Sequence, residues 1–155
     1  MSGLYLEDLH VGQRFSSGTH ALDEDQVIAF ASQFDPQPFH LDAAAAGAMF
    51  FGGLVASGWH TAAITMRLLV LGGVPIARGL IGVGAELSWP RPTRPGDVLR
   101  VESEVVEISP SRSRPDRGMV KVRSETRNQR DEVVQVLEAR MMVPRRPSDD
   151  RDRLA

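Results

Sequence analysis

Residues 57–71 form the stretch that most limits how this chain can fold. Apolar side chains lie on nearly every face of the helix that it predicts: Trp59, Ala62, Ala63, Ile64, Met66, Leu68, Leu69, Val70 and Leu71. A helix that is apolar all round either spans a membrane or lies in a protein core. The run is short for a bilayer and is interrupted by polar residues such as Thr61 and Arg67. We therefore expect a buried central helix that ends at Gly72 and Gly73.

Most of the remaining chain is predicted to be β-strand. The candidate strands are residues 11–21, 80–89, 98–108, 119–126 and 133–143. Their short connections indicate an antiparallel meander after the helix, and the sheet must wrap around that helix to bury it, which is an α+β arrangement. Such a sheet keeps an edge strand and an open face, which favours a homodimer or a higher homo-oligomer.

Length and composition limit the possible functions. A chain of 155 residues suits one domain, which we place at residues 1–144, followed by a charged, disordered tail at 145–155. The net charge of −2 gives no electrostatic case for binding nucleic acid or an anionic membrane. The absence of cysteine excludes disulfides, a thiol nucleophile and a thiolate metal site. No signal peptide is apparent, so a cytoplasmic protein is the default expectation.

Two short blocks of sequence carry the candidate chemistry. In the first, a helix begins after Asp23, with Gln26 completing a capping-box pattern, and stops at Pro36. Asp35 therefore lies at a break in the chain, where its carboxylate can be aimed. His40 follows five positions later on a loop stiffened by prolines, and acid–base catalysis needs such a pair on a rigid segment.

The second block connects the first one to the central helix. A short helix over 41–51, with Asp42 near its positive end, leads to Gly52 and Gly53. Gly58 then lies at the start of the central helix, where a backbone N–H can stabilise a developing oxyanion. We interpret the two blocks as two halves of one active site.

These residues match the motif of a known family. The motif has an aromatic residue, then Gly-Asp, any residue, Asn-Pro, an aliphatic residue and His. Phe30, Asp35, Pro38 and His40 occupy its aromatic, acid, proline and histidine positions, and Gly58 matches the glycine at the start of the family's helix. The chain thus resembles the MaoC-like dehydratase, or R-specific enoyl-CoA hydratase, branch of the hotdog superfamily.

The resemblance covers residues 6–143, and residues 89–99 match the family's strand and turn after the central helix. Three positions depart from the motif. Phe34 replaces the glycine before the acid, Gln37 replaces the asparagine, and Phe39 replaces the aliphatic residue. These changes keep the acid and the base but alter their surroundings, so they bear on the substrate more than on the reaction.

The resemblance implies a hotdog fold, with an antiparallel sheet wrapped around a long central helix. It also implies reversible hydration of an α,β-unsaturated acyl-CoA, with Asp35 and His40 activating water, the N–H of Gly58 as the oxyanion donor, and no metal or redox cofactor. The pocket residues expected to surround the pair are Phe34, Gln37, Phe39, Ser57 and Trp59. Arg91 and Arg94 are candidate contacts to the CoA phosphates.

Several alternatives remain open at this point. Asp35 could merely form an Asx turn, His40 could cap the following helix, and Ser57 is better placed as an N-cap than as a nucleophile. His60 fits a hydrogen-bonded core or pocket-lining histidine. The protein could instead be a hotdog acyl-CoA thioesterase, or a non-catalytic acyl-CoA-binding or heteromeric subunit.

Overall fold

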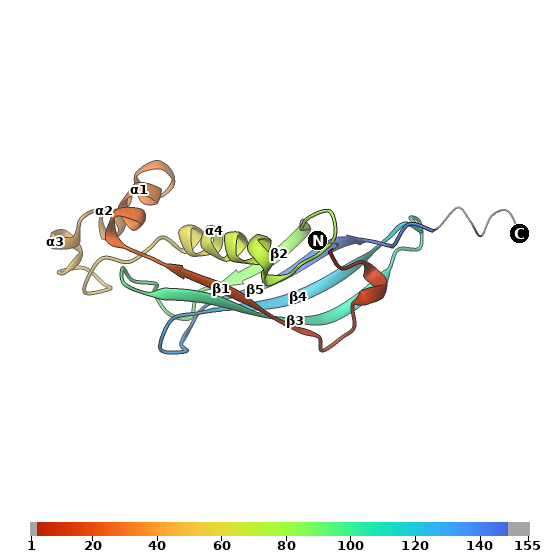
Figure 1. Cartoon of the computed structure of the whole chain (residues 1–155). Coiled ribbons are helices and arrows are strands. Elements are labelled where there is room, and N and C mark those ends of the chain that lie inside the picture. The colour runs from red at the N-terminus through yellow and green to blue at the C-terminus, as the bar shows by residue number, and fades with distance from the viewer. Residues whose placement is uncertain (1–2, 149–155) are drawn as a thin grey trace, which may run out of the picture.

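The computed structural model describes residues 3–148, which form a five-stranded antiparallel sheet against one central helix (Figure 1). The strands are β1 (Arg14–Ala21), β2 (Ile81–Ser88), β3 (Val98–Pro110), β4 (Arg117–Arg127) and β5 (Val133–Pro144). The helices are α1 (Glu24–Phe34), α2 (Pro38–Leu41), α3 (Ala43–Ala46) and α4 (Gly58–Leu68), with a 3-10 turn at Leu6–Asp8 and a π-helical turn at Leu69–Gly73. The expected α+β arrangement is confirmed.

The order of the strands differs from a simple four-strand meander. It is β1-β3-β4-β5-β2, so only β3, β4 and β5 follow one another as hairpins. β2 pairs with β5 at the far edge rather than with β3. Pro90, Pro92 and Pro95 interrupt the segment between β2 and β3. Because proline lacks the N–H that a hairpin ladder needs, this segment crosses the end of the sheet instead.

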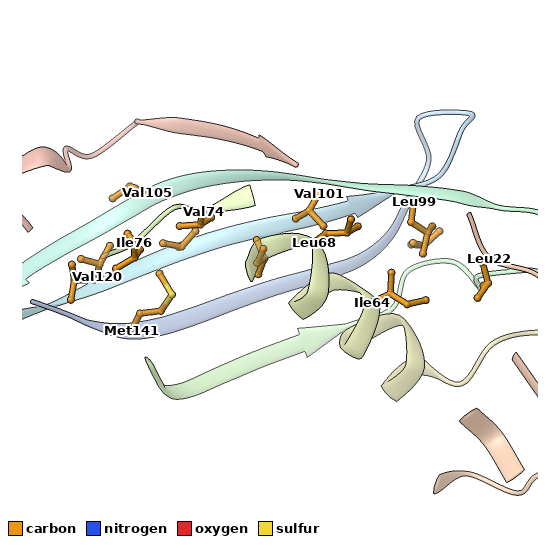
Figure 2. Packing of buried hydrophobic residues seen from close by; sticks show 14 of the residues in the cluster. Leu22, Ile64, Leu68, Val74, Ile76, Leu99, Val101, Val105, Val120 and Met141 are labelled. Atoms are coloured by element: carbon orange, nitrogen blue, oxygen red, sulfur yellow. The ribbon is translucent and has the colours of Figure 1, made fainter. Parts of the chain in front are cut away.

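The core lies between the inner face of the sheet and α4 (Figure 2). The predicted alternation in β3 is confirmed, since Leu99 and Val101 are fully buried beneath the helix. They belong to the same cluster as Ile64 and Leu68 of α4. Residues one turn apart on α4 therefore meet alternate residues of the strands, which is how the sheet covers one side of the helix.

The central helix is shorter and less buried than expected. Its regular part ends at Leu68, and a π-helical turn continues to Gly73. Trp59, Met66 and Val70 are 60%, 43% and 59% exposed, so the expectation of burial on every side is wrong for a single chain. The sheet covers only one face of α4, and the side chains on the other face are exposed in a single chain.

The helix expected over residues 41–51 is also wrong. The chain forms two single turns instead, α2 and α3, separated by Asp42 in an extended conformation. The side chain of Asp42 accepts hydrogen bonds from the N–H groups of Ala44 and Ala45, so it caps α3 and prevents one continuous helix. His40 therefore lies on α2 and not on a loop, and it is not the cap of the following helix.

Asp23 caps α1 as predicted, by accepting a hydrogen bond from the N–H of Gln26. The reciprocal half of the capping box is not formed, because the Gln26 side chain donates to the carbonyl of Ala21. At the other terminus, Arg145 and Arg146 of the expected tail contact the folded part, and residues 149–155 lie outside the described residues. Between residues 3 and 148, no helix combines the length and hydropathy needed to cross a bilayer.

Candidate active site

The structure brings Asp35, at the end of α1, next to His40, which lies on α2. Asp35 lies just past α1 with φ −154°, outside the helical region, as expected before Pro36. The Nε2 atom of His40 lies 3.2 Å from Oδ2 of Asp35. The Nδ1 atom of His40 lies 2.6 Å from the carbonyl oxygen of Val55. The two partners of the His40 ring are the Val55 carbonyl and the Asp35 carboxylate, and both can only accept hydrogen bonds when Asp35 is ionised. The protons of these contacts must then come from the ring nitrogens.

A carbonyl oxygen only accepts, so the hydrogen bond to Val55 places a proton on Nδ1 of His40. A direct hydrogen bond between Nε2 and Asp35 then needs a second proton, carried by the ring or by the carboxyl group. The ring is buried and held on both sides, so it cannot turn away from Asp35 without losing these contacts. The pair is thus built to take up and release one proton at a fixed position.

Two further side chains hold the carboxylate of Asp35. The hydroxyl of Ser57 donates to Oδ2 over 2.7 Å, and the amide of Gln37 donates to Oδ1 over 2.6 Å. Partial burial by itself raises the pKa of Asp35. The two hydrogen bonds and the adjacent His40 outweigh this effect, so the pKa lies below the ordinary value of 3.8. Asp35 is therefore an ionised hydrogen-bond acceptor at neutral pH.

Ser57 connects this carboxylate to the central helix. It is the N-cap of α4, where its Oγ accepts a hydrogen bond from the N–H of Trp59 over 3.3 Å. The same oxygen donates its proton to Asp35, so one hydroxyl both caps the helix and orients the acid. Serine suits this position because its hydroxyl can donate and accept at once, whereas a carboxylate cap could only accept.

Gly58 is the first residue of α4, so its N–H lies in the helix turn that leaves backbone donors without helical acceptors. The indole of Trp89 packs directly against this residue. A Cβ atom added to Gly58 would lie 2.7 Å from Cε2 of Trp89, closer than real contacts allow. Glycine is therefore required by the close approach of the indole.

A cavity of about 520 Å³ joins these groups. Asp35, His40 and Gly58 lie on its wall, which places the acid, the ring and the start of α4 around one space. Aromatic side chains form much of the remaining wall: Phe39, Phe50, Phe51, Trp59 and Trp89. A mostly apolar cavity with a few convergent polar groups is the form that small-molecule sites usually take.

Three of the five predicted pocket residues, Gln37, Phe39 and Trp59, line this cavity. Ser57 does not line it but reaches it through its hydrogen bond to Asp35. Phe34 was expected in the pocket, but it lies outside the cavity lining. It ends α1 on the exposed side, 69% exposed, with its ring centroid 5.2 Å from that of Phe30.

The two candidate arginines have different positions. Arg91 lines the cavity, and its guanidinium pairs with Glu132 over 3.1 Å. Arg94 does not line it, because its guanidinium donates to the carbonyl of Phe51 over 2.8 Å and so holds the loop after α3. The geometry therefore gives Arg94 a structural contact in place of the expected contact to a phosphate.

Nine lining residues were not anticipated from the sequence: Phe50, Phe51, Val55, Ala56, Thr61, Trp89, Pro90, Pro92 and Thr93. Thr61 could have been found, because it lies one turn after Gly58 on the same face of α4. Trp89 and Thr93 belong to the segment that crosses the end of the sheet, and no local pattern places them at the start of the helix. The indole N–H of Trp89 donates to the buried Gln135 over 2.9 Å, which fixes the indole against Gly58.

His60 does not line the cavity. Its ring stacks on Phe30 of α1, with centroids 4.5 Å apart and planes within 4°. Burial, and secondarily the charge of His20, lowers the pKa of His60 from 6.5 to about 4. Its Nδ1 has no hydrogen-bond partner among the described residues, so the expected hydrogen bond is not seen at this atom. His60 is a neutral packing residue between α1 and α4 at pH 7.

A five-stranded antiparallel sheet around a central helix, with this cavity at the start of the helix, is the hotdog arrangement. The structure superposes on that of the MaoC-like dehydratase from Rhodospirillum rubrum with a TM-score of 0.93 and 62% sequence identity, covering 94% of this chain and 100% of that chain. The sequence profile of the MaoC-like domain matches residues 9–128. The chain belongs to the MaoC-like dehydratase family.

Two further relatives carry more specific names. The 3-hydroxybutyryl-CoA dehydratase of Methylorubrum extorquens is 32% identical over 148 residues, which cover 95% of this chain and 88% of the relative. The structure of R-hydratase PhaJ1 from Pseudomonas aeruginosa has a TM-score of 0.74 and 31% identity, covering 93% of this chain and 88% of that chain. The similarity to both extends over nearly the whole folded part.

Proposed function

We propose that the protein catalyses the reversible hydration of an α,β-unsaturated acyl-CoA to a 3-hydroxyacyl-CoA. The observation that carries this proposal is the 3.2 Å approach of His40 Nε2 to Asp35 Oδ2 beside the cavity at the start of α4. The names of the two more specific relatives, a dehydratase and a hydratase, support the same reaction class.

In the proposed mechanism, a water molecule bound between Asp35 and His40 attacks C3 of the enoyl group. The pair accepts one proton from this water as the new C–O bond forms. It then returns a proton to C2, so atoms and charge balance without any further reactant. Each such proton transfer typically contributes ~10²–10⁴-fold to the rate. The proposed chemistry needs neither a metal nor a redox cofactor, because the pair supplies both the base and the acid.

Negative charge develops on the thioester oxygen when water adds to C3. The N–H of Gly58 is the proposed donor to this oxygen, because it lies at the positive end of α4 and lines the cavity. Losing one oxyanion donor typically lowers kcat by ~10²–10³-fold. Phe39 and Phe51 then form the apolar walls for the acyl group.

A homodimer is part of the same proposal. α4 keeps an exposed apolar face, and β2 is an edge strand whose Ile81 and Val83 are 46% and 48% exposed. A second copy related by a two-fold axis would pair the two β2 strands and bring the open faces of both helices together, which removes the exposed edge and the apolar face at once.

The proposal is tested with a panel of enoyl-CoA and 3-hydroxyacyl-CoA substrates. Loss of enoyl absorbance without release of free thiol is the expected result for the wild-type protein, and Asp35→Asn should lower its rate by ~10²–10⁴-fold. Release of free thiol would establish a thioesterase instead. If ligand binds but neither Asp35→Asn nor His40→Ala changes any activity, the protein is a non-catalytic binding subunit.

A further inference from the structure

A second cavity, of about 750 Å³, lies at the opposite end of the molecule from Asp35. It is formed where the chain enters β2 and where β5 ends, whereas α1 and α2 lie at the other end of the sheet in Figure 1. Its charged lining consists of four arginines and two carboxylates: Arg78, Arg117, Arg145, Arg146, Glu7 and Asp116. The cavity is therefore basic and distinct from the candidate active site of the same chain.

Two of these arginines are already paired. Arg117 contacts Asp116 over 3.0 Å, and Arg146 contacts Asp8 over 2.7 Å. Within residues 3–148, Arg78 and Arg145 have no carboxylate at ion-pairing distance. Guanidinium groups bind phosphate through paired N–H donors, so two such groups on one cavity wall suit an anion with phosphate groups.

The backbone holds Arg78 in an unusual conformation. Its φ of 64° lies in the left-handed region, which a residue with a long side chain rarely adopts. The turn is fixed by the N-terminal segment, since Leu4 donates to the carbonyl of Pro75 over 2.7 Å and Ala77 donates to the carbonyl of Leu4 over 2.8 Å. Such conformations persist only where the surrounding contacts enforce them, and they cluster at ligand sites.

The position of this cavity along β2 relates it to the active site of a second subunit. Ile81, the first residue of β2, lines the arginine cavity, and Ser88, the last residue, precedes Trp89 of the catalytic cavity. These ends are separated by about 24 Å within one chain, at ~3.4 Å per residue. A two-fold axis perpendicular to the sheet makes the two β2 strands antiparallel. When they pair about their centres, Ile81 lies opposite Ser88 of the partner subunit, about 5 Å away.

We propose that the arginine cavity of one subunit binds the phosphate groups of the thioester whose acyl group occupies the catalytic cavity of the other subunit. This inference rests on the proposed function and dimer. Acyl thioesters of this kind carry their phosphates at the far end of a long pantetheine arm, on CoA or on a carrier protein. Arg78 and Arg145 are the phosphate-binding residues, and each active site is complete only in the dimer.

Direct binding tests the inference without any turnover. We expect Arg78→Ala/Arg145→Ala to weaken binding of CoA and of 3′,5′-ADP roughly 10-fold or more in calorimetric titrations. The matched control, Arg112→Ala/Arg114→Ala, removes the same charge from the exposed loop between β3 and β4, outside the cavity, and should bind as the wild type does. Weaker binding of 4′-phosphopantetheine but not of 3′,5′-ADP would identify a carrier-protein thioester. Unchanged binding of all three ligands would overturn the inference.

Mixed dimers test whether the arginines act on the other subunit. In the first, one chain carries Asp35→Asn and its partner carries Arg78→Ala/Arg145→Ala. In the second, one chain carries all three substitutions and its partner is wild type. The only active site then uses intact arginines in the first dimer and substituted ones in the second. We expect KM to rise roughly 10-fold only in the second dimer, with kcat unchanged. The reverse pattern would place the arginines on the same chain, against the inference.

The two experiments separate failure of the inference from failure of the proposed function. If no thioester is turned over by the wild-type protein, the hydratase proposal fails, and the CoA titrations still decide the arginine cavity. If turnover is normal and the titrations show no loss, the hydratase proposal stands and the arginine cavity is rejected.

Discussion

The hydroxyl of Ser57, the N-cap of α4, donates to Oδ2 of Asp35 over 2.7 Å and so connects the start of α4 to the end of α1. Ser57→Ala should remove this contact and lower kcat by about 10-fold or more, since a charge-assisted hydrogen bond contributes ~1.5–3 kcal/mol. It should also destabilise the fold by ~1 kcal/mol through loss of the cap. Steady-state kinetics and urea denaturation measure the two effects.

Ser57→Gly separates them. Glycine caps helices nearly as well as serine, so Ser57→Gly should lower the free energy of unfolding by only about a few tenths of a kcal/mol. The hydroxyl is absent from this variant, as it is from Ser57→Ala. The kcat of this variant should match that of Ser57→Ala. Activity that follows stability across the two variants would show that Ser57 acts only as a cap.

Asp35→Asn changes one oxygen to an amide of the same shape. The amide cannot accept a proton, so hydration should fall by ~10²–10⁴-fold while the fold is retained. Asp42→Asn is the matched control, because Asn caps a helix as well as Asp does and Asp42 serves only α3. Equal activities for the two variants, assayed by enoyl absorbance, would exclude Asp35 from the chemistry.

Gly58→Ala should destabilise the protein by ~1–3 kcal/mol, because the new Cβ would lie 2.7 Å from the Trp89 indole. Trp89→Leu removes the indole, and the double variant should be more stable than the sum of the two single changes predicts. A double-mutant cycle from denaturation curves measures this coupling. Additive effects would mean that the indole does not press on Gly58 in solution.

His60 makes folding stability depend on pH. Its pKa is about 4 in the folded state and about 6.5 when unfolded, so between these values the unfolded chain binds more protons. Stability is therefore full above pH 6.5 and falls as the pH is lowered towards 4, by at most about 3 kcal/mol from this group. His60→Phe keeps an aromatic ring on Phe30 but cannot be protonated. Between pH 6.5 and 4, the unfolding free energy of the wild type should therefore fall by this amount relative to that of His60→Phe. A constant difference between the two proteins would refute the assignment.

The proposed dimer predicts a change of mass. Val70→Glu places a charge on the π-helical turn that follows α4, at a residue that is 59% exposed and outside both cavities. The wild-type protein should elute as a dimer in light-scattering chromatography and this variant as a monomer. A wild-type monomer at micromolar concentration would remove the basis for sharing a site between subunits.

The sequence was sufficient for the central elements because their patterns are local. The alternation through Leu99 and Val101 predicted the buried face of β3, and Asp23 and Ser57 marked the starts of α1 and α4. The pairing of Asp35 with His40 was also predictable, since five residues and two prolines leave few ways to separate them. The cavity next to the pair agrees with the interpretation of the two sequence blocks as one site.

Features that depend on distant residues could not be read in this way. Trp89 reaches Gly58 because a buried glutamine, Gln135, accepts its N–H, and nothing near either residue signals that contact. The position of β2 beside β5 depends on how the whole sheet closes around α4. The apolar composition of α4 did not distinguish burial by its own sheet from burial by a second copy, so its open face was missed.

The arrangement of α1, α2 and α3 has a consequence for heat tolerance. These helices project beyond the end of the sheet (Figure 1), and of their side chains only Val27 belongs to the buried apolar cluster, with Ile28 partly buried against it. They carry Asp35 and His40, yet most cooperative packing lies in the strands. Warming should therefore unfold α1, α2 and α3 several degrees before the strands, so that the proposed hydration activity and the circular dichroism are lost at separate temperatures.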